Sequence, residues 1–411
     1  MSAPSHIVYL DYAASAPRRP ESLEAERAYE ASAIAGANPN SLHTLGRAAA
    51  RELDGARARL ARCLGGGFRP SDVCLTSGGT ESNNLAVLGI AQGVRLRSAG
   101  RHVVVLSAIE HDSVIDLVGP LRERGLEVRV ARPGRDGVVA PETLAGLVDE
   151  HVSLVSVMAA NNETGVLQDV GALAAVAHGV GALFHTDAVQ AFGHVQLDLA
   201  SADAVSVAAH KLGGPVGAGA LAIRGRVPLR PAAFGGGQED GRRAGTQDVR
   251  GALAFAAAAE ASCRDLAATR ALVAARAQAL YDRLCAPGTG IVPTTTATMD
   301  ERRLPGMVSV MVPGVESETL ILALDEAGFE VSAGSACSSG SLDASHVLTA
   351  MGIPAESALG SLRVSFDERV APEDLDAFAD ALLAIVGRLT GAAGGSCRTR
   401  RATSRQKGAR A

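Results

Sequence analysis

Lysine is almost absent from this chain of 411 residues: only Lys211 and Lys407 occur, and arginine supplies nearly all of the positive charge. Lys211 stands where a short apolar run, residues 204–207, ends in a glycine-rich turn. An amine can lose a proton and form a Schiff base with an aldehyde, which a guanidinium cannot do. A single lysine in a loop is usually a solvated surface residue. The scarcity and the setting of Lys211 favour a chemical role instead.

Cysteine is scarce too, and the six cysteines are scattered without a C-x-x-C spacing. This pattern argues against a disulfide framework and a zinc ribbon, and it indicates a reduced, cytoplasmic setting with no intrinsic metal. No uncharged stretch reaches the length of a membrane span. Residues 1–6 lack the basic and apolar regions of a secretory signal. We therefore expect no membrane association.

Acidic residues are missing from residues 391–411, which contain six basic residues. The whole chain has a formal net charge of −5, so the residues before this tail carry −11. An acidic body with a short basic tail is not typical of a nucleic-acid-binding domain. The tail has no apolar periodicity, which predicts disorder. A non-enzymatic role in which the tail docks onto nucleic acid or an acidic partner would show salt-sensitive binding.

Short apolar runs alternate with helical patterns over the first two thirds of the chain, and the apolar fraction of 47% fits a globular protein. Strands are expected at 73–76, 103–107, 127–130, 152–159, 182–185, 204–207 and 218–223, with helices at 20–35, 43–64, 85–96, 113–124, 141–149 and 170–180. This alternation is typical of an α/β fold with a mostly parallel, doubly wound sheet.

After about residue 254 the regular alternation of strand and helix patterns gives way to an alanine- and arginine-rich segment. A long helix is expected from 254 to 284, followed by a smaller α+β arrangement and a last helix ending near 389. A chain of this length can form one large core and a second, smaller one. We expect a large domain at 17–262, a small domain at 1–16 and 263–390, and the tail at 391–411.

Polar residues follow several predicted strands, at the edge where ligands of such sheets gather. Our hypothesis is that Lys211 holds pyridoxal 5'-phosphate (PLP), whose ring nitrogen requires a carboxylate. Asp187 fits that role, although it would serve equally as a helix N-cap. Gln190 could donate to the ring oxygen, and His111 could stack on the ring unless it is a surface residue. Arg363 could bind a substrate carboxylate, although the chain contains many other arginines.

Two further segments carry possible chemistry. The turn from Ser77 to Thr80 joins a strand to a helix, so its free N–H groups could cradle a phosphate, although a plain helix cap explains it about as well. Cys337 lies in S-A-G-S-A-C-S-S-G-S, from Ser332 to Ser341, which has no bulky side chain. We expect that run to be exposed and mobile, which makes Cys337 a candidate nucleophile. A free cysteine in a linker is the alternative.

These segments form part of an ordered series: D-Y-A-A-S-A-P at Asp11, N-P-N-S at Asn38, T-S-G-G-T-E-S-N-N at Thr76, E-H at Glu110, N-N-E-T-G at Asn161, H-T-D-A-V-Q at His185, A-H-K-L-G-G-P at Ala209, R-R-A-G-T at Arg242 and S-A-G-S-A-C-S-S-G-S at Ser332. With this series, residues 8–389 resemble the PLP-dependent cysteine desulfurases, in the class V aminotransferase branch of PLP fold type I. The cysteine segment is similar to that of the subgroup with a long, mobile catalytic loop.

The resemblance implies a role for each matching residue. Lys211 carries PLP as a Schiff base, Asp187 pairs with the ring nitrogen, and Gln190 bonds the phenolic oxygen. His111 stacks on the ring and moves protons, while Cys337 accepts sulfur and could bind an iron–sulfur cluster transiently. The remaining residues bind substrate or cofactor: Asn162 and Arg363 hold the substrate, Asn162 also touches the cofactor, and Gly79, Thr80 and His210 contact the phosphate, joined by Thr246 of the partner subunit in a homodimer.

The implied reaction converts L-cysteine to L-alanine. The amine of Lys211 takes the α-proton, the thiolate of Cys337 attacks the substrate sulfur, and a persulfide remains for a sulfur-acceptor or scaffold protein. Iron–sulfur cluster assembly and tRNA thiolation would use the same site. One departure is Ala208, where relatives often have a serine. The missing hydroxyl puts cofactor affinity in question, since a bond to a charged group contributes about 1.5–3 kcal/mol.

Two other enzymatic functions stay open. A selenocysteine lyase would share Lys211 and Asp187, so the sequence leaves the preference between cysteine and selenocysteine undecided. Another class V aminotransferase or lyase would leave Cys337 idle.

Overall fold

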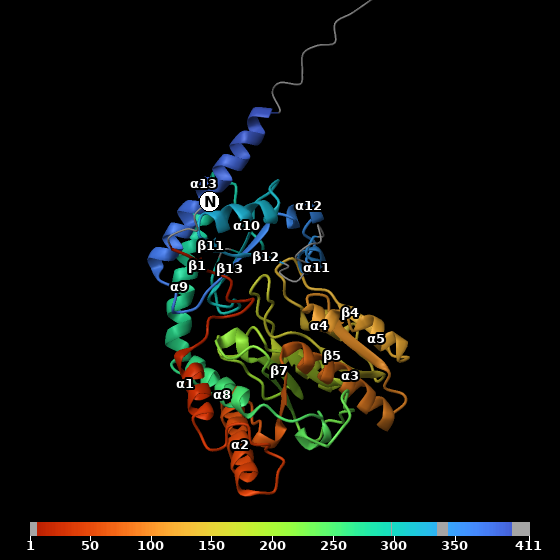
Figure 1. Ribbon diagram of the computed structural model, residues 1–411. Helices are drawn as coiled ribbons and strands as arrows, with labels where there is room; N and C mark the ends of the chain where they lie inside the picture. The colour runs from red at the N-terminus through yellow and green to blue at the C-terminus, as the bar shows by residue number, and fades with distance from the viewer. Residues whose placement is uncertain (1–5, 297, 335–343, 397–411) are drawn as a thin grey trace, which may run out of the picture.

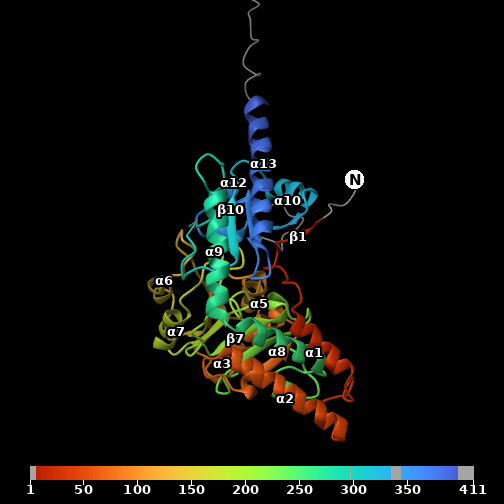
Figure 2. The same ribbon diagram turned by 90° about the vertical axis from the view of Figure 1, so that its left-hand side faces the viewer.

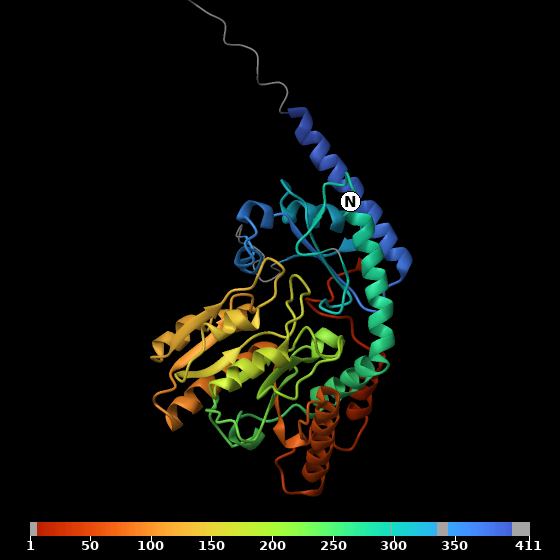
Figure 3. The same ribbon diagram turned by 180° about the vertical axis from the view of Figure 1, so that it is seen from behind.

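The computed structural model describes residues 6–296, 298–334 and 344–396, with side chains to residue 391. Cys337 and residues 397–411 of the predicted tail lie outside these ranges. Figures 1 and 3 show a lower part built around a large sheet and an upper part that contains both ends of the described chain.

The large sheet confirms the predicted α/β fold. Its order is β2 (Val73–Thr76), β8 (Gly219–Ile223), β7 (Ala204–Ala208), β6 (Leu183–Asp187), β5 (Val152–Ser156), β3 (Val103–Ser107) and β4 (Glu127–Ala131). The pairings from β7 to β4 are all parallel, whereas β8 runs antiparallel to both of its neighbours. The sheet is therefore mostly parallel, and most of its carboxyl ends meet at one edge.

Alternating side chains place a hydrophobic cluster on each face of this sheet. On β3, Val103 and Val105 belong to one cluster, while Val104 and Leu106 belong to another. The first cluster includes residues of α2 (Thr44–Leu64), α7 (Val170–Gly179) and α8 (Val249–Cys263); the second includes residues of α3 (Gly79–Arg97), α4 (Asp112–Ile115) and α5 (Val118–Glu123). Both faces are covered, as a doubly wound sheet requires.

A second sheet is antiparallel, in the order β12 (Ser332–Ala333), β13 (Ser361–Ser365), β10 (Met307–Met311) and β9 (Val292–Pro293). It shares a core with α9 (Leu266–Leu284), α10 (Ser317–Glu326) and α13 (Pro372–Ser396). Beside it, β1 (Val8–Tyr9) pairs in parallel with β11 (Phe329–Glu330). The amino-terminal segment thus packs with the carboxyl-terminal third, while the boundaries at residues 16, 262 and 390 stay predictions.

The long helix predicted from 254 to 284 is wrong, because the chain forms two helices there. It leaves α8 after Cys263 and begins α9 at Leu266, and between them Asp265 has a left-handed φ of 52°. α8 packs against α1 (Pro20–Glu30) and α2, whereas α9 packs against β10 and α13. Figure 2 shows α9 running upward beside α13. The break redirects the chain from one hydrophobic core to the other. Helical periodicity alone does not show which core each half of the segment joins.

Other boundaries differ less. α3 begins at Gly79 rather than at residue 85, so the glycine-rich turn forms the first turn of the helix. The helix predicted at 113–124 divides into α4 and α5, and α6 (Pro141–Ala145) ends four residues early. α13 continues to Ser396, so residues 391–396 of the predicted tail are helical. Among the described residues, no helix is long and apolar enough to cross a membrane.

Candidate active site

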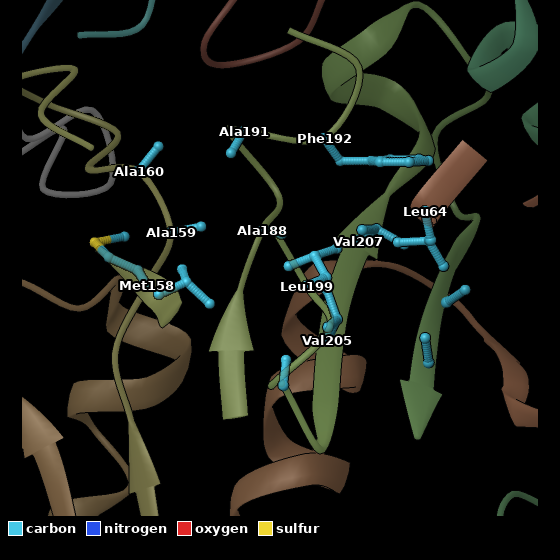
Figure 4. Packing of buried hydrophobic residues seen from close by; sticks show 14 of the residues in the cluster. Leu64, Met158, Ala159, Ala160, Ala188, Ala191, Phe192, Leu199, Val205 and Val207 are labelled. Atoms are coloured by element: carbon cyan, nitrogen blue, oxygen red, sulfur yellow. The ribbon is translucent and has the colours of Figure 1, made fainter. Parts of the chain in front are cut away.

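A cavity of about 280 Å³ lies at the carboxyl ends of the parallel strands. Nine of the residues singled out from the sequence line it: Gly79, Thr80, His111, Asn162, Asp187, Gln190, His210, Lys211 and Arg363. In Figure 4, the chain passes from β5 to Met158, Ala159 and Ala160, and from β6 to Ala188 and Ala191. These five residues belong to the hydrophobic core. The polar residues Asn162, Asp187 and Gln190, which lie close to them in the sequence, line the cavity instead.

Lys211 lies in the short 3-10 helix η2 (Ala209–Leu212), which follows β7 directly. Its Nζ atom donates hydrogen bonds to the carbonyl oxygens of Ala13 (2.6 Å) and Ala14 (2.9 Å). Gln190 donates from Nε2 to the same carbonyl of Ala13 (2.9 Å). Ala13 and Ala14, in the D-Y-A-A-S-A-P motif after β1, therefore line one side of the cavity. The fold brings this motif to Lys211, although Ala13 and Lys211 are 198 positions apart in the sequence.

Asp187 ends β6 and is almost completely buried. Its Oδ1 accepts the N–H of Val189 (2.9 Å), and its Oδ2 accepts the side-chain amide of Asn83 (2.6 Å). Burial raises the pKa of Asp187, and these two bonds oppose that rise. Asn83, on α3, was not predicted as a site residue, although it stands in the T-S-G-G-T-E-S-N-N motif.

His111 is the N-cap of α4, and the backbone N–H of Ser113 donates to its Nδ1 atom (3.1 Å). A nitrogen that accepts a hydrogen bond carries no proton, so the neutral imidazole holds its proton on Nε2. The side-chain hydroxyl of Ser113 lies 2.9 Å from the same Nδ1 and accepts from Asn83 (2.9 Å). One chain of polar contacts thus joins His111 to Asp187 through Ser113 and Asn83.

The amino terminus of α3 lies at one side of the cavity, where its backbone N–H groups could bind an anion. Gly78 adopts φ 153°, which glycine tolerates, and α3 begins at the next residue. A Cβ on Gly79 would come within 2.8 Å of Val189 Cγ2, so the backbone approaches closely there. His210 is half-buried, and its burial with the nearby charge of Lys211 lowers its pKa to about 4. A neutral His210 can donate to a phosphate from one ring nitrogen.

Arg363 enters from β13, so the cavity lies between the two sheets. Its guanidinium donates to the backbone oxygen of Asn162 (2.8 Å) and to Asp11 (2.8 Å). The Nε of Arg363 and the Oδ1 of Asn162 are buried and have no hydrogen-bond partner among the described residues. Buried polar atoms are rarely left unpaired, so these two indicate room for a polar ligand.

Two buried acids beside the cavity were not predicted as site residues. Glu110 accepts hydrogen bonds from the hydroxyl of Ser107 and the N–H of Met158, yet its burial raises its pKa to about 8. Glu163 accepts from the hydroxyl of Ser345 (2.5 Å), which is also the N-cap of α11 (His346–Ala350). Gly334 lies close to Glu163 as well, since a Cβ there would be 3.1 Å from Oε2. Glu163 thus contacts both flanks of the segment that includes Cys337.

The donor set fits PLP. It combines a lysine amine, a buried carboxylate, a helix amino terminus for a phosphate, and the unpaired atoms of Asn162 and Arg363. Thr246 does not line this cavity, so its predicted contribution to the partner subunit stays a prediction.

Fold and site together define a class V aminotransferase: a family model described as "Aminotransferase class-V" matches residues 8–378, and the chain belongs to that family. Within it, the chain is 40% identical to an IscS-like cysteine desulfurase of Mycobacterium tuberculosis, over 94% of this chain and 98% of that protein. A solved "NifS-like protein" superposes with a TM-score of 0.84 at 32% identity, over 93% of this chain and all of that one. The structure titled "SspA in complex with cysteine" gives 0.73 at 29% identity, over 87% and 98%. The resemblance to the cysteine desulfurases is confirmed.

Proposed function

We propose that this protein is a PLP-dependent cysteine desulfurase that converts L-cysteine to L-alanine and receives the sulfur on Cys337. The observation that carries the proposal is the meeting of Lys211, Asp187 and His111 in one cavity, beside the amino terminus of α3. The naming of relatives at 34–40% identity as cysteine desulfurases supports the substrate.

PLP, when bound, withdraws electrons from the α-carbon of the amino acid attached to it. Asp187 would keep the ring nitrogen protonated, because Asn83 and Val189 hold its carboxylate in place. Gly79, Thr80 and His210 would bind the phosphate, with Thr246 of the partner subunit completing the site in a homodimer. Gln190 would donate to the ring oxygen, as its Nε2 faces the same carbonyl as Lys211.

Lys211 would act as the base that removes the α-proton of the substrate, since an amine in this cavity can exchange protons with neighbouring groups. His111, with its proton on Nε2, would donate to the departing group or receive from it. Arg363 and Asn162 would orient the substrate carboxylate, because a guanidinium matches a carboxylate in two parallel hydrogen bonds.

Cys337 would supply the nucleophile. Its thiolate attacks the sulfur of L-cysteine, so that an S–S bond forms and the C–S bond breaks. The β-carbon gains a proton, alanine leaves, and the persulfide remains for a sulfur-acceptor or scaffold protein. This chemistry suits a reducing, cytoplasmic setting, where a thiol is not lost to disulfides.

The chain offers an internal control for the lysine, because it contains only two. After incubation with PLP, the wild type and Lys407→Ala should show the visible absorbance of a Schiff base and release alanine from L-cysteine. Lys211→Ala should do neither. Cys337→Ser should keep the absorbance and lose sulfur release. Absorbance that survives in Lys211→Ala would contradict the assignment of the lysine. Full activity of Cys337→Ser would instead favour another class V lyase or a selenocysteine lyase.

A further inference from the structure

A pair of cysteines lies far from Cys337 in the sequence. Cys63 is near the carboxyl end of α2, and Cys263 is the last residue of α8. The two helices pack together, and Glu260 of α8 binds Arg59 (2.7 Å) and Arg62 (3.2 Å) of α2. Both cysteines line the same cavity, and neither forms a disulfide among the described residues.

Both thiols open into one cavity of about 320 Å³. Its apolar wall includes Leu64, Phe192 and Leu199, all three labelled in Figure 4, and its charged residues are Arg62 and Glu260. Cys63 and Cys263 are each partly exposed. Within the described part of the chain, this cavity shares no lining residue with the cavity around Lys211. The pair is therefore open to small solutes without passing through the candidate active site.

The two thiols differ in acidity because one donates to the other. The hydrogen bond with Cys63, helped by the positive charge of Arg19, lowers the pKa of Cys263. The same bond raises the pKa of Cys63. By contrast, burial raises the pKa of Cys285 to about 11 and that of Cys74 to about 12. Among the four cysteines that the structure describes, Cys263 forms the thiolate most readily.

We propose that Cys63 and Cys263 form a second reactive thiol site, which is oxidised reversibly by small-molecule disulfides. Cys263 attacks one sulfur of the external disulfide, giving a mixed disulfide and releasing one thiolate. Cys63 then gives up its proton and attacks the sulfur of Cys263, which forms the Cys63–Cys263 bond and releases the second thiolate. The two thiols of the protein are oxidised by two electrons, and the external disulfide is reduced to two thiols.

The bond would join the carboxyl end of α2 to that of α8, directly before the chain turns at Asp265 into α9. It would cross-link two helices whose cysteines are 200 positions apart in the sequence. Because α2 and α8 already pack against each other, we expect the bond to form without a large rearrangement. The site does not depend on the proposed function of Lys211 or Cys337.

The test exposes the folded, PLP-loaded protein to oxidised glutathione and identifies cysteine-containing fragments by mass spectrometry. The wild type should yield a fragment pair joined through Cys63 and Cys263, lighter by two hydrogen atoms and reversed by dithiothreitol. Cys63→Ser should stop at a glutathione adduct on Cys263, since serine can still donate to the thiolate but cannot displace glutathione. Cys263→Ser should leave Cys63 largely unmodified. Cys285→Ser, which removes another half-buried thiol, should behave as the wild type.

Reactivity gives a second readout. A thiol-directed reagent at neutral pH should label Cys263 of the Cys63→Ser variant roughly tenfold or more faster than Cys285, because each unit of pKa changes the thiolate fraction tenfold. Circular dichroism should show that all variants are folded. A folded wild type that forms no Cys63–Cys263 bond would overturn the proposal, as would a glutathione adduct confined to Cys63.

Discussion

The side-chain amide of Asn83 lies 2.6 Å from Oδ2 of Asp187 and donates a hydrogen bond to it. The same amide donates to Ser113, whose backbone N–H binds His111. One residue of α3 therefore positions both the carboxylate proposed for the cofactor ring and the imidazole proposed for proton transfer.

We expect Asn83→Ala to reduce kcat/KM about ten- to a hundredfold, because a hydrogen bond to a charged group contributes about 1.5–3 kcal/mol. The loss should fall on kcat rather than on KM, since Asn83 donates to Asp187 and Ser113 and not to Asn162 or Arg363, the residues proposed to hold the substrate. Steady-state kinetics with L-cysteine measures both. Asn84→Ala is the matched control: among the described residues, this neighbour donates to the backbone oxygens of Thr80 and Ser113 and to no side chain, so its loss should be much smaller. Equal losses in the two variants would contradict the positioning role.

The hydroxyl missing at Ala208 can be restored. Ala208 ends β7, and its Cβ is 3.7 Å from the position of a Cβ on Gly79, at the start of α3. A serine there could donate to the phosphate proposed to bind at α3, so we expect Ala208→Ser to lower the dissociation constant of PLP about tenfold. Spectroscopic titration of the PLP-free protein measures this. Ser206→Ala serves as a control on the same strand, because its hydroxyl binds His185 instead (2.9 Å). A weaker affinity in Ala208→Ser would show that the phosphate lies elsewhere.

The buried carboxyl group of Glu110 predicts a pH dependence of stability. Its pKa is about 8 in the folded protein, against 4.5 for an exposed glutamate. Between these values the folded state binds a proton that the unfolded state lacks. The wild type therefore loses stability as the pH rises from about 4.5 to about 8.

Glu110→Gln removes this titration while its oxygen can still accept from Ser107 and Met158. Relative to the wild type, the variant should gain up to about 4 kcal/mol in unfolding free energy between pH 4.5 and pH 8, at 1.36 kcal/mol for each pKa unit. Urea unfolding across this range measures the difference. Glu52→Gln, an exposed change on α2, should give a curve parallel to the wild type. A parallel curve for Glu110→Gln as well would mean that Glu110 is ionised in the folded state.

Local patterns predicted the strands well. β2 and β3 have the predicted bounds, β4, β7 and β8 differ by one residue, and β6 differs by one residue at its start and two at its end. β5, predicted at 152–159, already ends at Ser156. Short apolar runs between turns are typical of buried strands. The helix boundaries were less predictable. The start of α3 at Gly79 depends on the turn geometry of Gly78, and the break at Asp265 depends on which core each half of the segment joins.

The candidate site shows the same division. Lys211 and Asp187 could be found because each stands at the end of an apolar run, in a motif that carries its own chemistry. Asn83 and Glu110 lie within such motifs, but their importance arises from burial and from partners that spacing does not specify. No sequence pattern predicted that Cys63 and Cys263 share a cavity, since they lie 200 positions apart in the chain.

The sequence by itself determined the strand order along the chain, the lysine, and the residues at the carboxyl ends of the strands, because these follow from hydrophobic periodicity and residue chemistry over short distances. Only the tertiary structure decided which distant groups meet. Arg363 reaches Asp11 and Asn162 from the second sheet, and Glu110 changes its pKa by losing contact with water. Proximity and desolvation are properties of the packed chain as a whole, so no local stretch encodes them.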